Sequence, residues 1–204
     1  MKISVVQMPD GTVDYDLVVS FLELRKEIFV DQKDWPLYSY ERLEFEQYDT
    51  FGAIYIIAHE GRSAIGGARL VRTDHRIGTG VVEYSYMIRD AYMGLLPGMP
   101  PDLCFKVPPS DSSTWELTRL ASLPSTNVAG LILDRANEFL ASKNAATCLF
   151  LGPPAFLRMA KTMNYEPRRL GPIVRNNDGA FLAFSCKVVP GMEQLRGRKI
   201  LERT

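Results

Sequence analysis

The pattern of apolar and polar positions in the first half of the chain predicts a strand, a helix and a hairpin, in that order. Residues 3–6 form a short apolar run typical of a strand. In residues 15–30 apolar side chains recur at three- and four-residue spacing, which indicates an amphipathic helix. Two apolar runs at 53–59 and 63–71 are separated by a short turn around Gly61, so we expect an antiparallel hairpin.

The second half of the chain alternates between strand and helix patterns. We expect a strand at 114–120, a helix from about 127 to 141, a strand at 147–151, a helix beginning at Pro153 and Pro154, and strands at 165–170 and 180–188.

Two segments have no clean period. The first, 35–49, is rich in aromatic and charged residues, and we expect it to be irregular with a helical turn. The second, 89–113, carries five of the 13 prolines and should be a long loop, with a helical turn as an option. Since no repeat or domain boundary interrupts residues 1–204, we predict a single mixed α/β domain with a polar tail from about residue 191.

The overall composition excludes several classes of protein. The 24 basic and 24 acidic residues balance, so no global positive field favours a nucleic-acid partner. No apolar run is long enough to span a bilayer, and the amino terminus lacks the apolar core of a signal peptide, which predicts a cytoplasmic protein without membrane contact. The three cysteines lie in apolar surroundings and only two histidines are present, so we expect buried thiols and no metal site.

Arg25 lies inside an apolar stripe of the first predicted helix, on the same face as Phe21 and Phe29. An arginine is rarely buried without a paired anion. The nearest carboxylates beyond this helix are Asp34, Glu44, Glu46 and Asp49. Two interpretations remain open, since Arg25 either forms a structural salt bridge to the following segment or lines a ligand cleft.

Glu116 and Arg119 are three residues apart in a segment with a strand pattern. A regular pleat would place their side chains on opposite faces, with Trp115, Leu117 and Arg119 together on one of them. A bulge would instead bring Glu116 and Arg119 to the same face, and such bulges are common beside active sites. The spacing leaves both arrangements open.

Taken in order, these residues resemble the acyl-homoserine-lactone synthases, the LuxI-type autoinducer synthases of bacterial quorum sensing. The residues that carry the resemblance are Arg25, Phe29, Trp35, Glu46, Asp49, Arg69, Glu116 and Arg119, and they span about residues 20–120. The family usually has aspartate where this chain has Glu46. The resemblance implies a three-layer αβα sandwich with a mixed central sheet, like that of the N-acetyltransferases.

The same resemblance implies a reaction between S-adenosylmethionine and an acyl thioester carried by acyl-carrier protein or coenzyme A. S-adenosylmethionine is then a substrate, and no cofactor is expected. The implied catalytic residues are Glu116, Glu46, Asp49, Arg69 and Arg119, with Glu116 the first choice for the general base and Glu46 the second. The implied residues for binding S-adenosylmethionine are Arg25, Phe29, Trp35 and Phe105.

An acyl chain needs an apolar tunnel, and a carrier protein needs a cationic surface. For the tunnel we expect Leu149, Leu151, Met159 and Phe184, with Thr147 near the acyl 3-position. For docking we expect the cluster Arg158, Lys161, Arg168 and Arg169, which would also suit the phosphates of coenzyme A. Core packing and a solvated surface are the respective alternatives.

Two other functions are compatible with the same fold. A general acyl-coenzyme A-dependent N-acyltransferase would hold pyrophosphate on a glycine-rich turn, but the stretch from Leu123 to Gly130 lacks repeated glycines. A non-catalytic acyl-binding domain would be expected to lose the charged residues, which this chain retains.

Overall fold

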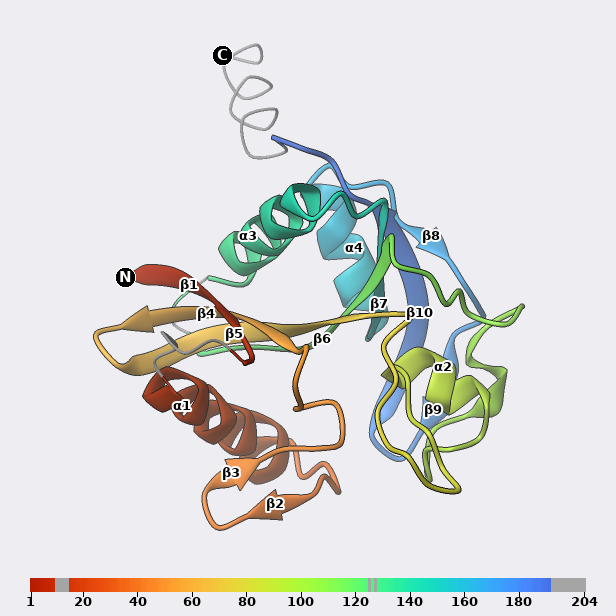
Figure 1. The fold of residues 1–204 in the computed structure, drawn as a ribbon, viewed down its shortest axis with the longest axis horizontal. Helices are drawn as coiled ribbons and strands as arrows, with labels where there is room; N and C mark the ends of the chain where they lie inside the picture. Colours follow the sequence, from red (N-terminus) through yellow and green to blue (C-terminus); the bar gives the residue numbers. More distant parts are fainter. Residues whose placement is uncertain (10–14, 125, 127, 192–204) are drawn as a thin grey trace.

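In a computed structural model, an eight-stranded mixed sheet lies between two layers of helices (Figure 1). The structure describes residues 1–9, 15–124, 126 and 128–191. Helices α3 (Ala129–Ser142) and α4 (Pro154–Thr162) cover one face of the sheet, and α1 (Tyr15–Arg25) and α2 (Met87–Tyr92) lie on the other. The predicted three-layer αβα architecture is therefore confirmed.

The main path of the sheet runs in the order β1, β4, β5, β6, β7, β10, β8, and β9 pairs with β10. The bounds of these strands are β1 Lys2–Gln7, β4 Ile54–Glu60, β5 Ser63–Arg72, β6 Thr114–Ser122, β7 Thr147–Gly152, β8 Arg168–Arg169, β9 Val174–Asn176 and β10 Gly179–Lys187. Every pairing is antiparallel except that between β6 and β7, which are joined through α3. The predicted hairpin of β4 and β5 is present.

The two faces of the sheet bury different sets of side chains. Ile54, Ile56 and Leu70 pack with Leu117 in the core under α3 and α4, whereas Tyr55 belongs to the core under α1. Helix α1 lies very close to the sheet because position 67 is glycine: a Cβ there would be 2.7 Å from the Phe21 ring.

The parallel pair β6 and β7 separates part of the way along its length. Their pairing extends only from Thr114 and Thr147 to Leu117 and Phe150. Strand β6 continues to Ser122 and β7 to Gly152 without further pairing between them. We call this divergence the strand split, and it opens the middle of the sheet next to Glu116 and Arg119.

Several elements differ from the sequence predictions. The first helix is α-helical only to Arg25 and continues as the π-helix η1 (Lys26–Gln32). The segment 35–49 contains a small hairpin of β2 (Ser39–Tyr40) and β3 (Leu43–Glu44).

The proline-rich segment is a loop with a helical turn, in line with the prediction, but a helix that was not predicted covers its start. It overlaps α2 and contains the short 3-10 helix η2 (Pro101–Leu103). The strand expected at 165–170 shrinks to β8, because only two of its residues pair with β10. The predicted start of the third helix at residue 127 and most of the polar tail lie outside the described residues.

Candidate active site

Arg25, at the end of α1, forms the centre of a buried ion cluster. Its side chain is fully buried, with Nε 2.5 Å from Glu44 Oε2. Its two terminal nitrogens donate to both oxygens of Asp49 at 2.7 and 2.8 Å. All three nitrogens of Arg25 are thus used internally, so the structure supports the salt-bridge interpretation of this residue.

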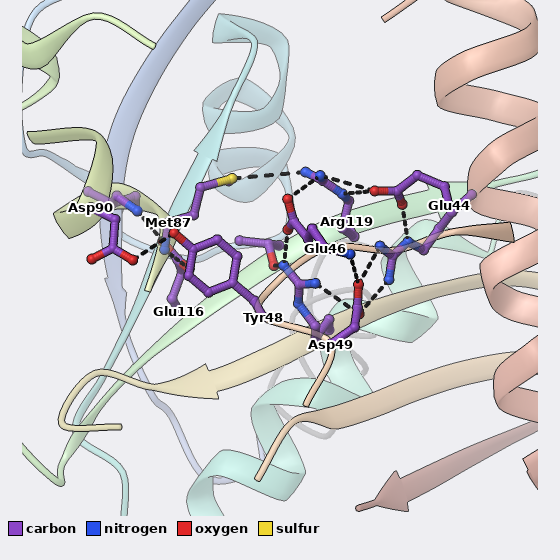
Figure 2. Close-up of polar contacts among 12 residues, drawn as sticks. Glu44, Glu46, Tyr48, Asp49, Met87, Asp90, Glu116 and Arg119 are labelled. Atoms are coloured by element: carbon purple, nitrogen blue, oxygen red, sulfur yellow. Dashed lines mark hydrogen bonds and ion pairs between the residues drawn. The ribbon is translucent and has the colours of Figure 1, made fainter. Parts of the chain in front are cut away.

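Two further arginines from the sheet complete the cluster. Arg69 of β5 lies 2.5 Å from Glu46 and 2.9 Å from Asp49, and it also donates to Thr118 Oγ1. Arg119 of β6 lies 2.7 Å from Glu46 and 3.2 Å from Glu44. Three guanidinium groups therefore face three carboxylates, as Figure 2 shows. We call Arg25, Glu44, Glu46, Asp49, Arg69 and Arg119 the ion cluster.

A bulge in β6 directs Arg119 into the ion cluster. Two residues of β6, Arg119 and Leu120, lie opposite the single residue Ala68 of β5. Arg119 itself has φ 55°, in the left-handed region that residues with a Cβ seldom adopt. Arg119 thereby leaves the face of Leu117, so the bulge interpretation is confirmed.

Within the ion cluster, the arginines favour the ionised forms of Asp49 and Glu46. Burial by itself would raise the pKa of Asp49, but Arg69 and Arg25 outweigh it and hold the pKa well below the usual range. Burial also opposes ionisation of Glu46, where Arg119 and Arg69 hold the pKa down. Glu46 has 16 % of its side chain exposed, against 4 % for Asp49 and none for Glu44, so it is the carboxylate of this cluster that a ligand can reach.

Glu116 is separate from the ion cluster and faces the start of α2. Its two oxygens accept hydrogen bonds from the backbone amides of Met87 at 3.0 Å and Ile88 at 2.7 Å. Burial raises the pKa of Glu116 to about 7, and these two amides limit the rise. Met87 also links the two groups, because its sulfur lies 3.9 Å from Arg119 Nη1 (Figure 2).

The sequence reasoning did not assign several residues that build this site. Glu44 was considered only as a partner for Arg25, although it also binds Arg119. Tyr48 connects the ion cluster to α2: its hydroxyl donates to the buried Asp90 of α2 at 2.7 Å, and its ring lies 5.5 Å from Arg69 Cζ. Asp90 had no sequence signal, because its segment was expected to be a loop.

Aromatic side chains form a wall beside Arg119. Phe29 and Trp35 are stacked with ring centroids 5.2 Å apart, and Trp35 contacts Phe181 of β10 edge to face. Arg119 Cζ lies 6.0 Å from the Phe29 ring. Phe105 does not join this wall in any described contact: its residue is 69 % exposed, and its amide donates to the Leu170 carbonyl.

The residues expected to form the acyl tunnel are divided between the two faces of the sheet, and their role stays a prediction. Leu149 and Leu151 pack in the core near α2, whereas Phe184 and Met159 pack in the core under α3 and α4. Thr147 is two residues before Leu149 on β7, so its side chain points to the same face of the sheet as that of Leu149. Side chains of alternate strand positions point to opposite faces, so these five residues are divided between two cores and meet only where a passage crosses the sheet.

An apolar cavity of about 30 Å³ lies instead between the sheet and helices α3 and α4. It is lined by Leu117, Leu133, Ala136, Asn137, Leu140, Cys148, Phe150, Phe156, Ala160, Tyr165, Cys186 and Lys187. Leu117 and Phe150 are the last paired residues before the strand split. The cavity therefore adjoins the split, one residue along β6 from Glu116.

The four residues expected to dock a carrier are exposed. Arg158 and Lys161 lie three residues apart on α4, and Arg168 and Arg169 form the edge strand β8. The three cysteines are buried and unpaired, as predicted. In the described part of the chain, no helix has the length and apolar character needed to cross a membrane, and no group of three His, Cys, Asp or Glu side chains is arranged to hold a metal ion.

No protein-family model matches the chain, but individual proteins do. An acyl-homoserine-lactone synthase of Acinetobacter nosocomialis is 24 % identical over 185 residues, which cover 84 % of this chain and 91 % of that protein. An acyl-homoserine-lactone synthase of Pseudomonas aeruginosa is 31 % identical over 101 residues, or 48 % of this chain. That alignment spans 42 % of the Pseudomonas protein, less than half its length.

Solved structures share the fold. The coenzyme A-dependent acyl-homoserine lactone synthase BjaI, solved with S-adenosylmethionine and isopentyl-coenzyme A, superposes with a TM-score of 0.78 at 20 % identity, covering 97 % of this chain and 88 % of BjaI. A putative N-acetyltransferase from Lactobacillus plantarum has a TM-score of 0.58 at 11 % identity, covering 92 % of this chain and 98 % of that one. The chain thus has the fold of the N-acetyltransferases.

Proposed function

Because the chain belongs to the LuxI-type acyl-homoserine-lactone synthases, which are acyltransferases, we propose that it joins S-adenosylmethionine to an acyl thioester. The α-amine attacks the thioester carbonyl, forming an amide and releasing the thiol of the donor. The methionyl carboxylate then attacks the γ-carbon, closing the lactone and expelling methylthioadenosine. The product is an acyl-homoserine lactone, a quorum-sensing signal.

The observation that carries this proposal is the ion cluster at the strand split, beside the Phe29 and Trp35 wall. S-adenosylmethionine is cationic at its sulfonium and ammonium groups, and the partly exposed Glu46 offers a carboxylate to them. The aromatic faces suit the adenine ring and attract the sulfonium. Arg25 and Arg69 have no exposed surface, so we assign them the positioning of Glu44, Glu46 and Asp49.

We assign the role of general base to Glu116. The attacking amine must lose a proton, and a carboxyl with a pKa of about 7 is well matched to accept it near neutral pH. Glu46 and Asp49 are weaker bases, because neighbouring arginines hold their pKa values below the usual range. Between ammonium and amide the nitrogen loses two protons: one protonates the departing thiolate, and the other leaves through Glu116 to solvent.

We assign the acyl chain to the apolar cavity behind the split. A thioester carbonyl placed between β6 and β7 would lie near Glu116, and its chain would pass Leu117 and Phe150 into the cavity. The walls are mostly apolar, which suits a hydrocarbon chain.

The proposal is tested by incubating the purified protein with S-adenosylmethionine, with and without acyl thioesters on coenzyme A and on carrier protein. We expect methylthioadenosine to be released only when a thioester is present, in step with an acyl-homoserine lactone detected by mass spectrometry. Acylation of unrelated amines, with no lactone from any thioester, would instead identify a general N-acyltransferase.

A further inference from the structure

Three phenylalanine rings form a compact cluster at the cavity entrance. Phe150 and Phe184 are stacked with centroids 5.0 Å apart, and Phe156 of α4 meets each of them edge to face at 5.4 Å. Phe150 and Phe156 are both cavity walls. Each ring thus supports the other two, and none can move into the space of its neighbours.

Phe156, one of the cavity walls, packs against the end of β7. A Cβ added to Gly152, the last residue of β7, would be 2.8 Å from Cδ1 of the Phe156 ring. The ring therefore packs directly against the β7 backbone just beyond Phe150, where pairing with β6 has ended. A chain that enters from the split must pass this ring.

The free space beyond the ring is small. A volume of about 30 Å³ holds roughly two groups the size of a water molecule. The side-chain amide of Asn137 donates to the Val189 carbonyl and accepts from the Val189 amide. Turning Asn137 away to enlarge the cavity would therefore break two hydrogen bonds. A long acyl chain fits only if packed side chains are displaced, and close-packed interiors resist such displacement.

We propose that this cavity selects donors with short acyl chains and that Phe156 sets the accepted length. This inference rests on the proposed function and specifies its donor. The recognised group is the acyl chain of a thioester, whichever carrier bears it. Phe156 is suited to this role because it is only half-buried and comes from a helix, whereas Phe150 and Phe184 are buried strand residues whose loss would damage the sheet.

The test compares butanoyl, hexanoyl, octanoyl, decanoyl and dodecanoyl thioesters, each on coenzyme A and on carrier protein. For the wild-type protein we expect kcat/KM to fall at least tenfold from hexanoyl to dodecanoyl on either carrier. In Phe156→Ala the ratio of kcat/KM for hexanoyl to kcat/KM for dodecanoyl should fall by about tenfold or more. Apolar pockets discriminate between chains of different size on this scale. A preference that followed the carrier and not the chain would overturn the proposal.

Phe139→Ala is the matched control. Phe139 is also a half-buried phenylalanine on a helix of the same layer, but it packs against Trp115 and is not a cavity wall. Its loss should leave the chain-length ratio unchanged. An equal shift in both variants, or a uniform loss for all donors in Phe156→Ala, would overturn the role of Phe156. If Phe156→Ala does not fold, Phe156→Leu should give a smaller shift in the same direction.

Direct binding separates this inference from the proposed function. Calorimetry of the acyl-coenzyme A series without S-adenosylmethionine should show Kd rising with chain length in the wild-type protein and rising less in Phe156→Ala. Absence of lactone from every donor would count against the proposed function, while the Kd series would still support or overturn the short-chain cavity.

Discussion

Glu116 combines two features that rarely occur together in one carboxyl group. It holds the first turn of α2 through the amides of Met87 and Ile88, yet its pKa of about 7 leaves it partly protonated at neutral pH. Each oxygen accepts one amide hydrogen and retains a further lone pair, so anchoring α2 and accepting a substrate proton are compatible. The two roles are separable by experiment.

As a base, Glu116 must be ionised, so kcat/KM should rise with pH through about 7 and level off above it. Glu116→Gln should lower turnover by roughly two to four orders of magnitude and abolish this limb of the profile. Stopped assays of methylthioadenosine release between pH 5 and 9 would measure both effects. Two buffers that are both used near pH 7 would separate a buffer effect from the titration of Glu116.

The control for this substitution is Asp90→Asn. Asp90 is likewise a buried carboxylate, within α2 itself, and accepts hydrogen bonds from Ser85 and Tyr48, but it is outside the ion cluster. Its loss should reduce stability without removing the pH dependence near 7. If both variants lost activity and stability equally, and kcat/KM still rose with pH through about 7 in each, Glu116 would only hold α2 in place and would not act as the base.

At the scale of elements, the site depends on how closely α1 approaches the sheet. Phe21 lies against the backbone of Gly67, two residues before Arg69 on β5, and Arg25 follows one turn later on α1. This approach lets Arg25 reach Asp49, which Arg69 also binds from the sheet. Gly67 therefore allows the short distance between α1 and the sheet that the ion cluster requires.

Gly67→Ala should push α1 outward and destabilise the fold by about 1–3 kcal/mol, the usual cost of overpacking a core. Urea unfolding followed by circular dichroism would measure the change in the free energy of unfolding. Gly80→Ala is the matched control, since a Cβ there would meet no atom within 4 Å. A nearly neutral Gly67→Ala would show that α1 tolerates a wider spacing.

The sequence predicted long periodic elements well and short ones poorly. The hairpin of β4 and β5 and the strand β6 have patterns set by burial, which sequence shows directly. Helix α2 and the hairpin of β2 and β3 are only a few residues long and are fixed by tertiary contacts, such as the Glu116 carboxylate at the start of α2.

The residues predicted to line the acyl tunnel illustrate a second limit of prediction from sequence. Leu149 and Phe184 both read as apolar strand residues, and only the pairing register of β7 with β10 shows that they face opposite ways. The same limit applies to Glu116 and Arg119, because their spacing left a regular pleat and a bulge both open, and only the register of β6 with β5 shows the bulge.

At the scale of the whole molecule, charge is balanced overall but unevenly placed. Four exposed basic side chains, Arg158 and Lys161 on α4 and Arg168 and Arg169 on β8, stay our prediction for a cationic docking surface. Such a surface attracts an acidic carrier protein and accelerates encounter without changing the chemical step.

Replacing Arg158 and Lys161 by glutamate should raise KM for an acyl-carrier protein by about tenfold and change kcat little. Initial rates over a range of salt would measure this, because screening past about 0.15 M should weaken wild-type binding. Arg135→Glu, at an exposed position on α3, is the control and should have little effect. Indifference of carrier-protein kinetics to both charge reversal and salt would exclude this surface as the docking site.

The ion cluster also has a consequence for how the protein folds. Its members come from α1, β3, the following loop, β5 and β6, and the pairing of Arg119 with Glu44 joins residues 75 positions apart. Glu46 and Asp49 each bind arginines from two different elements, so a partly docked state leaves buried charge incompletely paired, which is strongly unfavourable. Partly assembled states are therefore penalised, and we expect this half of the molecule to unfold as one cooperative unit, without an intermediate in which α1 has detached and the site survives.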